Sequence, residues 1–323
     1  MLWLIFISCS IISGISGAPA EPENSTEIVV EVPKGSTARG MAKPLAKAGA
    51  IDDADAFGWY VRINKEGGCI KAGKHRVNRA MSHAEIIEAL CGVPVTNSVP
   101  FTVVEGWRIR EIDAALAKAG YIQAGEYKAL AQSPRSFRVD YPLPPDSLEG
   151  YLFPETYSIE PDRFDVRKFI QRQLDMFGDR FVDKHGDGFG KRSLEEVVIM
   201  GSMIVREEPT EKQRPMVAGI LWKRIDNSWN LGVDATSRYT LAKWNDRRAF
   251  LKKLRDPKDP YNTRLRQGLP PTAIGNPDIS SLESAAAPTK SPYWYYLHDK
   301  KGVLHPSRSV KEHEAYRRKY NVY

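Results

Sequence analysis

Two adjacent carboxylates, Glu207 and Glu208, follow an apolar stretch and offer the clearest acid–base chemistry in the sequence. The preceding residues 197–205 are apolar on nearly every side of a helix, which predicts a helix buried inside the fold. Pro209 cannot continue this helix and biases the residue before it out of the helical region, so we expect Glu208 at the helix terminus. Burial and the helix C-terminus should raise the pKa of such a carboxyl group toward the range useful for proton donation.

The elements that must position these carboxylates are the buried helix and a second helical segment that follows the break and ends near Ile225. The alternative interpretation is an ordinary charged helix end, with Arg206 and Arg214 as ion-pair partners of the two acids. Structural ion pairs also perturb the pKa values of acids, so the motif alone does not separate these interpretations.

Composition bounds the class of protein. With 323 residues and 42% hydrophobic residues, the chain can bury a full core and could hold two domains. Its net charge of +7 comes from Lys and Arg spread along the sequence and suits an anionic partner. The sequence carries no Walker loop, zinc-type Cys/His cluster or helix-turn-helix signature, so we expect neither nucleic acid nor a metal as a ligand.

The N-terminus indicates export. Residues 1–20 contain no charged side chain and read as an apolar run followed by small residues, which is typical of a signal sequence or a membrane anchor. We therefore expect the rest of the chain outside the cytoplasm. There, Cys69 and Cys91 could form a disulfide, and two buried free thiols are the alternative.

Short strands and helices alternate in the first part of the chain. Residues 21–55 predict a stalk that leads into a strand at Glu27–Val32 and a short helix over Met41–Ala50. Further strands are predicted at Gly58–Ile63, Lys71–Val77 and Val99–Val104, and helices from Ser82 and over Arg108–Ala119. We expect residues 56–130 to form a subdomain that resembles LysM-like modules, which bind polysaccharide chains; a purely structural subdomain is the alternative.

Several loops of the second part could form the walls of a site. Leu148–Tyr157 combines three aromatic residues and two acids with a Gly and a Pro, a composition that suits sugar stacking or core packing. Residues 231–239, 261–264 and 268–274 are dense in Gly, Pro and polar residues. A β-prone segment at Tyr293–Leu297 precedes a partner strand that carries His305, a lone histidine of the kind that is more often structural than catalytic.

These segments together resemble the endolytic murein transglycosylase (YceG-like) family, from roughly Val29 to the C-terminus. The matching blocks stand in family order: EGYLFPETY, the apolar helix ending in Glu208, QRPMVAGILWKRI, the DAT turn at Asp234, YNTR, GLPPTAIGNP and the final aromatic strand. The resemblance implies an α+β fold, with a small LysM-like α/β subdomain followed by a mixed α+β catalytic domain (131–323) around the buried central helix.

It also implies a function and a location. Members of this family cleave the glycan strands of peptidoglycan internally, without a cofactor, from a single-pass anchor in the cytoplasmic (inner) membrane that leaves the bulk of the chain outside the cytoplasm. The implied partners are peptidoglycan strands and the membrane, with peptidoglycan synthases as further candidates.

The family's essential acid aligns with Glu208. Arg206 stands where the family has an earlier Glu, and Gln213 where it has an acid, so Glu207 remains a competing candidate. Motif membership makes the following residues candidates for substrate binding: Glu149, Tyr151, Glu155, Tyr157, Asp234, Thr236, Asn262 and Thr263.

One carboxyl group suffices for the implied reaction. Glu208 would protonate the leaving glycosidic oxygen and then take the proton of the muramyl C6 hydroxyl, which closes on C1 as a 1,6-anhydro product. Glu149, Asp234 and Asn262 would support the positive charge on the sugar, while Tyr151, Tyr157 and Thr263 would position the glycan.

Three rival functions follow from the same residues. A glycoside hydrolase of the same polymer would use Asp234 or Glu155 as a second carboxylate. A non-catalytic protein would only bind cell-wall glycan. A pyridoxal-dependent lyase would need a Schiff-base lysine and a phosphate cup, and the sequence offers neither.

Overall fold

The computed structural model describes residues 16–95, 97–186 and 188–322. The chain divides into two compact units, one through Ser98 and one from Val99 to Tyr323. This division falls inside the range 56–130 that the sequence suggested as one subdomain. The helix expected over Arg108–Ala119 therefore packs within the second unit.

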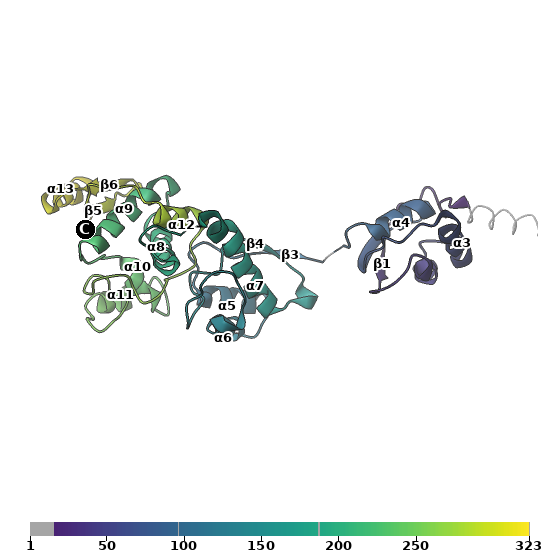
Figure 1. The fold of residues 1–323 in the computed structure, drawn as a ribbon, viewed down its shortest axis with the longest axis horizontal. Coiled ribbons are helices and arrows are strands. Elements are labelled where there is room, and N and C mark those ends of the chain that lie inside the picture. The colour runs from purple at the N-terminus through teal and green to yellow at the C-terminus, as the bar shows by residue number, and fades with distance from the viewer. Residues whose placement is uncertain (1–15, 96, 187, 323) are drawn as a thin grey trace, which may run out of the picture. The chain divides into compact units, whose positions relative to one another are not determined.

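The first unit is a two-stranded sheet with helices (Figure 1). Strands β1 and β2 are antiparallel, with Ile28 opposite Val77. Val30 and Val32 alternate with exposed residues and face a core that includes Leu45 and Phe57. The elements in chain order are β1 (Ile28–Val32), η1 (Arg39–Met41), α2 (Ala42–Lys47), α3 (Ala54–Asn64), β2 (Gly73–Val77) and α4 (His83–Cys91).

The strand predicted at Gly58–Ile63 is wrong, because this segment belongs to helix α3. The Asp53 side chain accepts hydrogen bonds from the backbone N–H groups of Asp55 and Ala56, at 2.8 and 3.1 Å, and so caps the helix. Phe57 and Val61, one helical turn apart, are its buried residues together with Ala56. The cap and the apolar spacing outweigh the β-propensity of the Trp-Tyr-Val run.

In this unit the structure confirms the helix predicted from Ser82, and it decides between the two alternatives left open for Cys69 and Cys91. Helix α4 begins at a capping box in which the backbone N–H of Glu85 donates to the Ser82 hydroxyl, and the Ser82 N–H to the Glu85 carboxylate. Cys69 and Cys91 form a disulfide, with their Cα atoms 5.1 Å apart.

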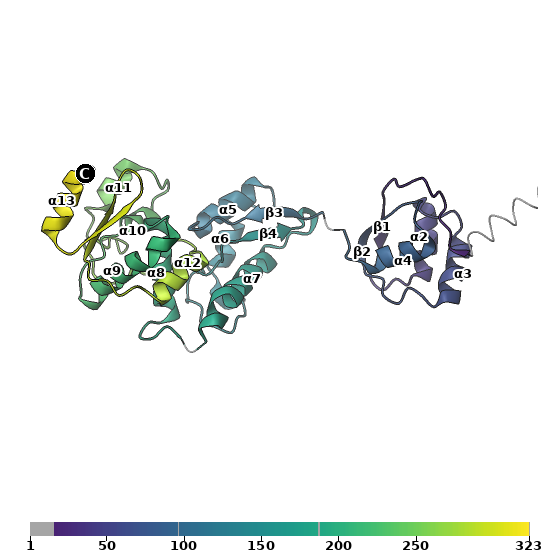
Figure 2. The ribbon, with the colours of Figure 1, turned by 90° about the horizontal axis from the view of Figure 1, so that it is seen from above.

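The second unit opens with a sheet formed by β3 and β4, which pair antiparallel although they are more than fifty residues apart along the chain (Figure 2). Helices α5, α6 and α7 pack with this pair through a shared aromatic core. The elements of this part are β3 (Val99–Thr102), α5 (Ile109–Lys118), α6 (Glu126–Ala131), η2 (Pro134–Ser136), β4 (Thr156–Ile159), η3 (Pro161–Arg163), α7 (Val166–Phe177), η4 (Gly178–Val182) and η5 (Asp183–His185).

Helix α8 is the centre of the second unit, as predicted. It contacts α9, α10 and α12 (Figure 1). Its residues from Val197 to Ile204 are all buried. The remaining elements are α8 (Leu194–Glu207), η6 (Glu211–Gln213), α9 (Arg214–Asp226), α10 (Asp234–Tyr239), α11 (Arg247–Lys253), α12 (Ile279–Ala286), β5 (Tyr295–His298), β6 (Leu304–Ser307) and α13 (Val310–Tyr320).

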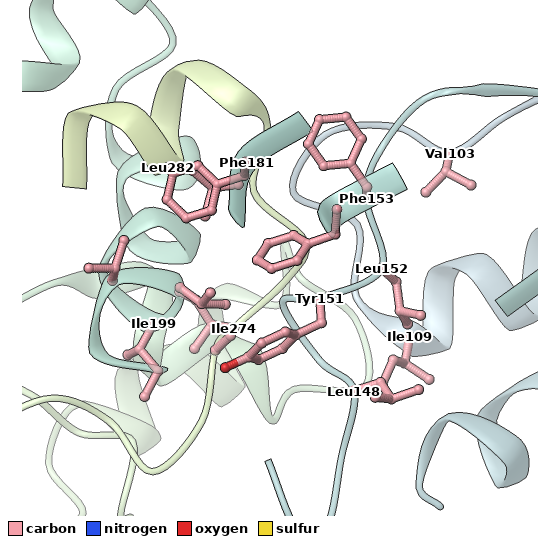
Figure 3. Close-up of a cluster of buried hydrophobic side chains, with 14 of the residues drawn as sticks. Val103, Ile109, Leu148, Tyr151, Leu152, Phe153, Phe181, Ile199, Ile274 and Leu282 are labelled. Carbon is pink, nitrogen blue, oxygen red and sulfur yellow. The ribbon is translucent and has the colours of Figure 1, made fainter. Parts of the chain in front are cut away.

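The loop of residues 148–153 packs against α8 and against the segment before α12. Figure 3 shows Tyr151 and Phe153 beside Ile199, Ile274 and Leu282 in this part of the core. Gly150 has a φ of +95°, and a Cβ atom there would lie 2.5 Å from the Cβ of Ala273 and 2.6 Å from the Cγ1 of Val198. The glycine of the EGYLFPETY segment is thus required both by its backbone conformation and by close packing.

Asn276 ties this loop to the rest of the unit. Its Oδ1 accepts hydrogen bonds from the backbone N–H groups of Gly150 and Leu152, at 2.9 and 3.0 Å. Its Nδ2 donates to the backbone oxygen of Trp107 at 2.9 Å. One buried amide therefore joins three segments that are far apart in the sequence, which is a packing reason for the asparagine of GLPPTAIGNP.

The predicted α+β class is confirmed: within the described residues, the strands form two-stranded antiparallel sheets, and more residues lie in helices than in strands. The expected signal or anchor at 1–20 lies outside the described residues as far as residue 15. In the part of the chain that the structure covers, no helix is both long and apolar enough to cross a membrane.

Candidate active site

The C-terminus of α8 delivers the two carboxylates. Glu207 is the last helical residue, and Glu208 is extended, with φ −129° and ψ 101°, ahead of Pro209. The prediction that Glu208 stands at the end of the buried helix is therefore confirmed. The Glu208 side chain has no exposed surface, so this carboxyl group is removed from bulk solvent.

Both oxygens of the Glu208 carboxyl group are engaged. Oε1 accepts a hydrogen bond from the backbone N–H of Thr210 at 2.8 Å. Oε2 lies 2.8 Å from Nε2 of His298, which comes from strand β5. A histidine ninety residues further along the chain thus covers the acid that the sequence singled out.

The two arginines do not pair with the carboxylates, so the ion pairs expected for an ordinary charged helix end are absent from the described residues. The guanidinium of Arg214 forms a buried ion pair with Asp278, with 2.6 Å between Nη1 and Oδ2. The Arg206 guanidinium stacks over the ring of Trp244, 4.2 Å from its centroid. Each arginine therefore interacts with another side chain, and the carboxyl groups of Glu207 and Glu208 are hydrogen-bonded to other residues.

A cleft of about 710 Å³ lies beside this corner of the molecule. Its lining is strongly polar, and the residues that matter most for chemistry are Glu207, Asp234, Arg264, Tyr296, His298 and His313. Glu208 does not line the cleft itself. His298, whose side chain is 25% exposed, lines the cleft and contacts Glu208.

Glu207 faces the cleft directly. The Tyr296 hydroxyl donates to its Oε2 at 3.1 Å, and the backbone N–H of Ala235 also donates to this carboxyl group. Burial raises the pKa of Glu207 above its ordinary value, and the nearby Asp234 raises it further, while these two hydrogen bonds lower it. Glu207 is therefore a second carboxyl group with proton-exchanging character in the same corner.

Two loops that the sequence predicted as site walls are joined beneath the cleft. The backbone N–H of Gly232 donates to the Thr263 carbonyl oxygen at 2.9 Å, and the hydroxyls of Thr236 and Thr263 are 3.0 Å apart. Asn262 is fully buried, and its Nδ2 donates to backbone oxygens at 253, 254 and 256. These three predicted substrate-binding residues support the wall from within and have no surface at the cleft.

Asp234 and Arg264 are the residues that this joined pair of loops presents to the cleft. Oδ1 of Asp234 accepts from Nε and Nη2 of Arg264, at 2.8 and 2.6 Å. Both side chains remain nearly half exposed, so the pair is available to a ligand. Among the predicted substrate-binding residues, Asp234 is the one that lines this cleft.

Glu149 lies in a different place. It is buried, and its carboxyl group accepts hydrogen bonds from the Ile109 N–H at 3.0 Å and the Tyr239 hydroxyl at 3.1 Å. Burial raises its pKa to about 8. It borders a smaller cavity of about 290 Å³ that also involves Arg108. Its contacts join α5 to α10, which favours a packing role over contact with a glycan in the main cleft.

The remaining predicted residues do not reach the cleft either. Tyr151 and Tyr157 are 2% exposed; the first packs against Phe177, and the hydroxyl of the second donates to the Phe153 carbonyl oxygen at 2.7 Å. Glu155 is partly exposed, with its Oε2 3.9 Å from Arg180. The aromatic residues of this segment therefore pack in the core, which was the alternative to sugar stacking.

Sequence reasoning missed His298 and Tyr296. The predicted strand at Tyr293–Leu297 contains Tyr296, and strand periodicity places residue 298 on the same face. This periodicity was the available signal. It does not show, however, that the strand face with Tyr296 and His298 packs against the end of α8. His305, in contrast, is structural as expected: its Nε2 is 2.9 Å from Asp299, and its ring stacks on Tyr320.

An α+β protein whose buried helix ends in two carboxyl groups beside a polar cleft has the arrangement of an enzyme that works by acid–base chemistry. The chain belongs to the YceG-like family, whose family model matches residues 30–319.

Its relatives are cell-wall enzymes by name. An endolytic murein transglycosylase of Bacillus subtilis is 29% identical over 94% of this chain and 87% of its own length. One from Streptococcus pneumoniae is 22% identical over 92% of this chain, which spans 59% of that longer protein. A solved structure of a YceG-like protein from Listeria monocytogenes has a TM-score of 0.57 at 25% identity, covering 90% of this chain and 99% of that one.

Proposed function

We propose that this protein is an endolytic peptidoglycan transglycosylase that cleaves glycan strands between MurNAc and GlcNAc and leaves 1,6-anhydroMurNAc ends. The observation that carries the proposal is the position of Glu208 directly after the end of a buried helix. Its carboxyl group contacts His298, which lines the polar cleft. The names of the Bacillus and Streptococcus relatives support the same activity.

The reaction needs one proton-exchanging carboxyl group. Glu208 supplies the proton that the glycosidic oxygen accepts as its bond to C1 breaks. The carboxylate then recovers a proton from the muramyl C6 hydroxyl as that oxygen closes on C1. The nucleophile is part of the substrate, so proximity replaces an activated water molecule.

The cleft walls suit the charge that develops in this reaction. Positive charge grows on the sugar ring as the bond breaks, and the carboxylates of Glu207 and Asp234 face the cleft. Arg264 fixes Asp234 through two hydrogen bonds, which holds its carboxylate in one orientation. We assign Asp234 to electrostatic support of the sugar and keep Glu207 as an auxiliary acid.

Digestion of purified sacculi tests the reaction type. The protein is incubated with peptidoglycan, and the soluble and insoluble products are analysed by mass spectrometry. A transglycosylase yields anhydro ends that lack the water added by hydrolysis, with new ends distributed along the strands. Products that carry the added water would instead assign a glycoside hydrolase.

We also propose where the enzyme works. The Cys69–Cys91 disulfide fits an oxidising compartment outside the cytoplasm, and an N-terminal anchor in the cytoplasmic membrane would hold the protein near newly made strands. Peptidoglycan synthases remain candidate partners.

We propose the unit that ends at Ser98 as the LysM-like module. This unit has a groove of about 470 Å³ lined by Trp59, Arg39 and Arg62. An exposed aromatic ring beside cationic groups suits an acidic glycan. Binding of this protein and a Trp59→Ala variant to sacculi would test the assignment, since unchanged binding would contradict it.

A further inference from the structure

The acid assigned above has no direct access to the cleft. The Glu208 side chain is fully buried, and its Oε1 is held by the backbone N–H of Thr210. Its link to the cleft is the 2.8 Å contact between Oε2 and Nε2 of His298. A glycosidic oxygen in the cleft would therefore meet the imidazole ring of His298 before it met the carboxyl group.

His298 has the right connections on both sides. Nε2 is engaged by Glu208, whereas Nδ1 makes no hydrogen bond within the described part of the chain and is not among its fully buried, unpaired polar atoms. The two ring nitrogens lie on different edges of the imidazole, so one can exchange a proton with Glu208 while the other exchanges one with a ligand.

The ring is also held in place. It makes an edge-to-face contact with Tyr296, at 6.2 Å between centroids, and its strand β5 pairs with β6. The titratable and charged groups around it are Glu207 and Glu208 at the end of α8, and Asp234, Arg224, Arg264, Tyr295, Tyr296 and His313 around the cleft.

We infer that His298 is a proton relay between Glu208 and the substrate, and so a further catalytic residue. The inference rests on the proposed function and deepens it, because it names the group that touches the reacting oxygens. Glu208 acts through the imidazole ring, because it shares a proton with Nε2 and yields that proton to Nε2 when Nδ1 gives up its own.

The steps balance without an added reactant. The pair starts with one proton on Nδ1 and one shared between Nε2 and Oε2. The Nδ1 proton passes to the glycosidic oxygen, which leaves C1 with the electron pair of the bond, and the shared proton settles on Nε2 beside the Glu208 carboxylate. The C6 hydroxyl then attacks C1 and gives its proton to Nδ1, which restores the starting state.

The simpler alternative is that His298 is only a lid that covers Glu208. The two roles predict opposite results for His298→Ala. A lid removed would expose Glu208 to the cleft and preserve or increase strand cleavage. A relay removed would lower turnover by roughly 10²–10⁴-fold, the usual contribution of a positioned acid–base group, while sacculus binding stays unchanged.

Two further variants make this test decisive. In His298→Gln, a side-chain amide can still hydrogen-bond Glu208 but cannot pass a proton, so the relay predicts a loss of turnover as large as in His298→Ala. His305→Ala is the matched control, because His305 also contacts a carboxylate, Asp299, at 2.9 Å but does not line the cleft. The His305→Ala variant should still cleave glycan strands at temperatures at which thermal unfolding shows that this variant is folded.

Added imidazole supplies a readout that a structural role would not move. Imidazole fits the space vacated in His298→Ala, and the relay predicts a concentration-dependent recovery of cleavage in this variant but not in Glu208→Gln. Undiminished cleavage by either His298 variant, or a loss without rescue, would overturn the relay. If Glu208→Gln also cleaves at the wild-type rate, the proposed role of Glu208 fails; if only the His298 variants cleave, the relay alone fails.

Discussion

The Nε of Arg214 donates a hydrogen bond to the backbone carbonyl oxygen of Glu208 at 3.0 Å, and both residues are buried. The same guanidinium is paired with Asp278, which also caps α12 by accepting the Ser281 N–H at 2.7 Å. Glu208 is thus connected, through Arg214 and Asp278, to the N-terminus of α12. The position of Glu208 depends on a backbone contact that no other basic side chain could make with the same fork geometry.

Arg214→Lys tests this attachment. Lysine can keep a charge opposite Asp278 but has no second donor in the place of Nε, so the Glu208 carbonyl oxygen is left without its partner. We expect a loss of unfolding free energy of about 2 kcal/mol for the unsatisfied buried group and reduced turnover from a mispositioned Glu208. Urea unfolding and strand cleavage measure these effects. Wild-type values for both would contradict the attachment.

Glu149→Gln should change the pH dependence of stability. The folded-state pKa of Glu149 is about 8, above its ordinary value of 4.5. Its contribution to stability is therefore complete below pH 4.5 and is lost as the pH rises toward 8, with a slope of up to about 1.4 kcal/mol per pH unit. Glutamine does not titrate, so this part of the slope should be absent from urea unfolding at pH 5, 6 and 7. Parallel curves for the two proteins would show that Glu149 is ionised when folded.

Gly150→Ala should be far more destabilising than Gly268→Ala. Both glycines have a positive φ, +95° and +88°, so both substitutions carry the same backbone strain. A Cβ at 150 collides with Ala273 and Val198, whereas a Cβ at 268 meets no atom within 4 Å. We expect about 1 kcal/mol at Gly268 from conformation alone and a further 1–3 kcal/mol or so at Gly150 from overpacking. Equal losses of stability for the two variants in thermal unfolding would contradict the packing explanation.

Asp234→Asn separates electrostatic support from a hydrolytic mechanism. The amide keeps the size of the side chain but removes the negative charge beside the sugar. We expect turnover to fall on the order of 10²-fold, while the remaining products still carry anhydro ends. Glu155→Gln is the control, because Glu155 lies outside the cleft lining and should be dispensable. Complete loss of activity with Asp234→Asn, in an enzyme whose products carry added water, would assign Asp234 as the second carboxylate of a hydrolase.

The sequence was most informative where local rules decide the structure. The apolar run before Glu208 predicted a buried helix, and Pro209 predicted where it ends. Intrinsic β-propensity was misleading at α3, where strand-forming residues at 59–61 lie in a helix stabilised by the Asp53 cap and by burial of Phe57. Side-chain capping and the facing core outweighed intrinsic propensity there.

The candidate site was only partly predictable, because its geometry depends on contacts between distant segments. Thr236, Asn262 and Thr263 belong to the right loops, but their side chains are buried, and Asp234 is the one predicted substrate-binding residue that lines the cleft. The contact between His298 and Glu208 spans ninety residues and follows from how β5 packs beside the end of α8, which no local pattern encodes.

The most direct test of the account is the cleavage of purified sacculi by Glu208→Gln, with products quantified by mass spectrometry and sacculus binding measured in parallel. The substitution preserves the shape of the side chain and removes its exchangeable proton. The account predicts that anhydro ends fall by roughly 10³-fold or more while binding is retained. Anhydro ends formed at the wild-type rate would contradict it.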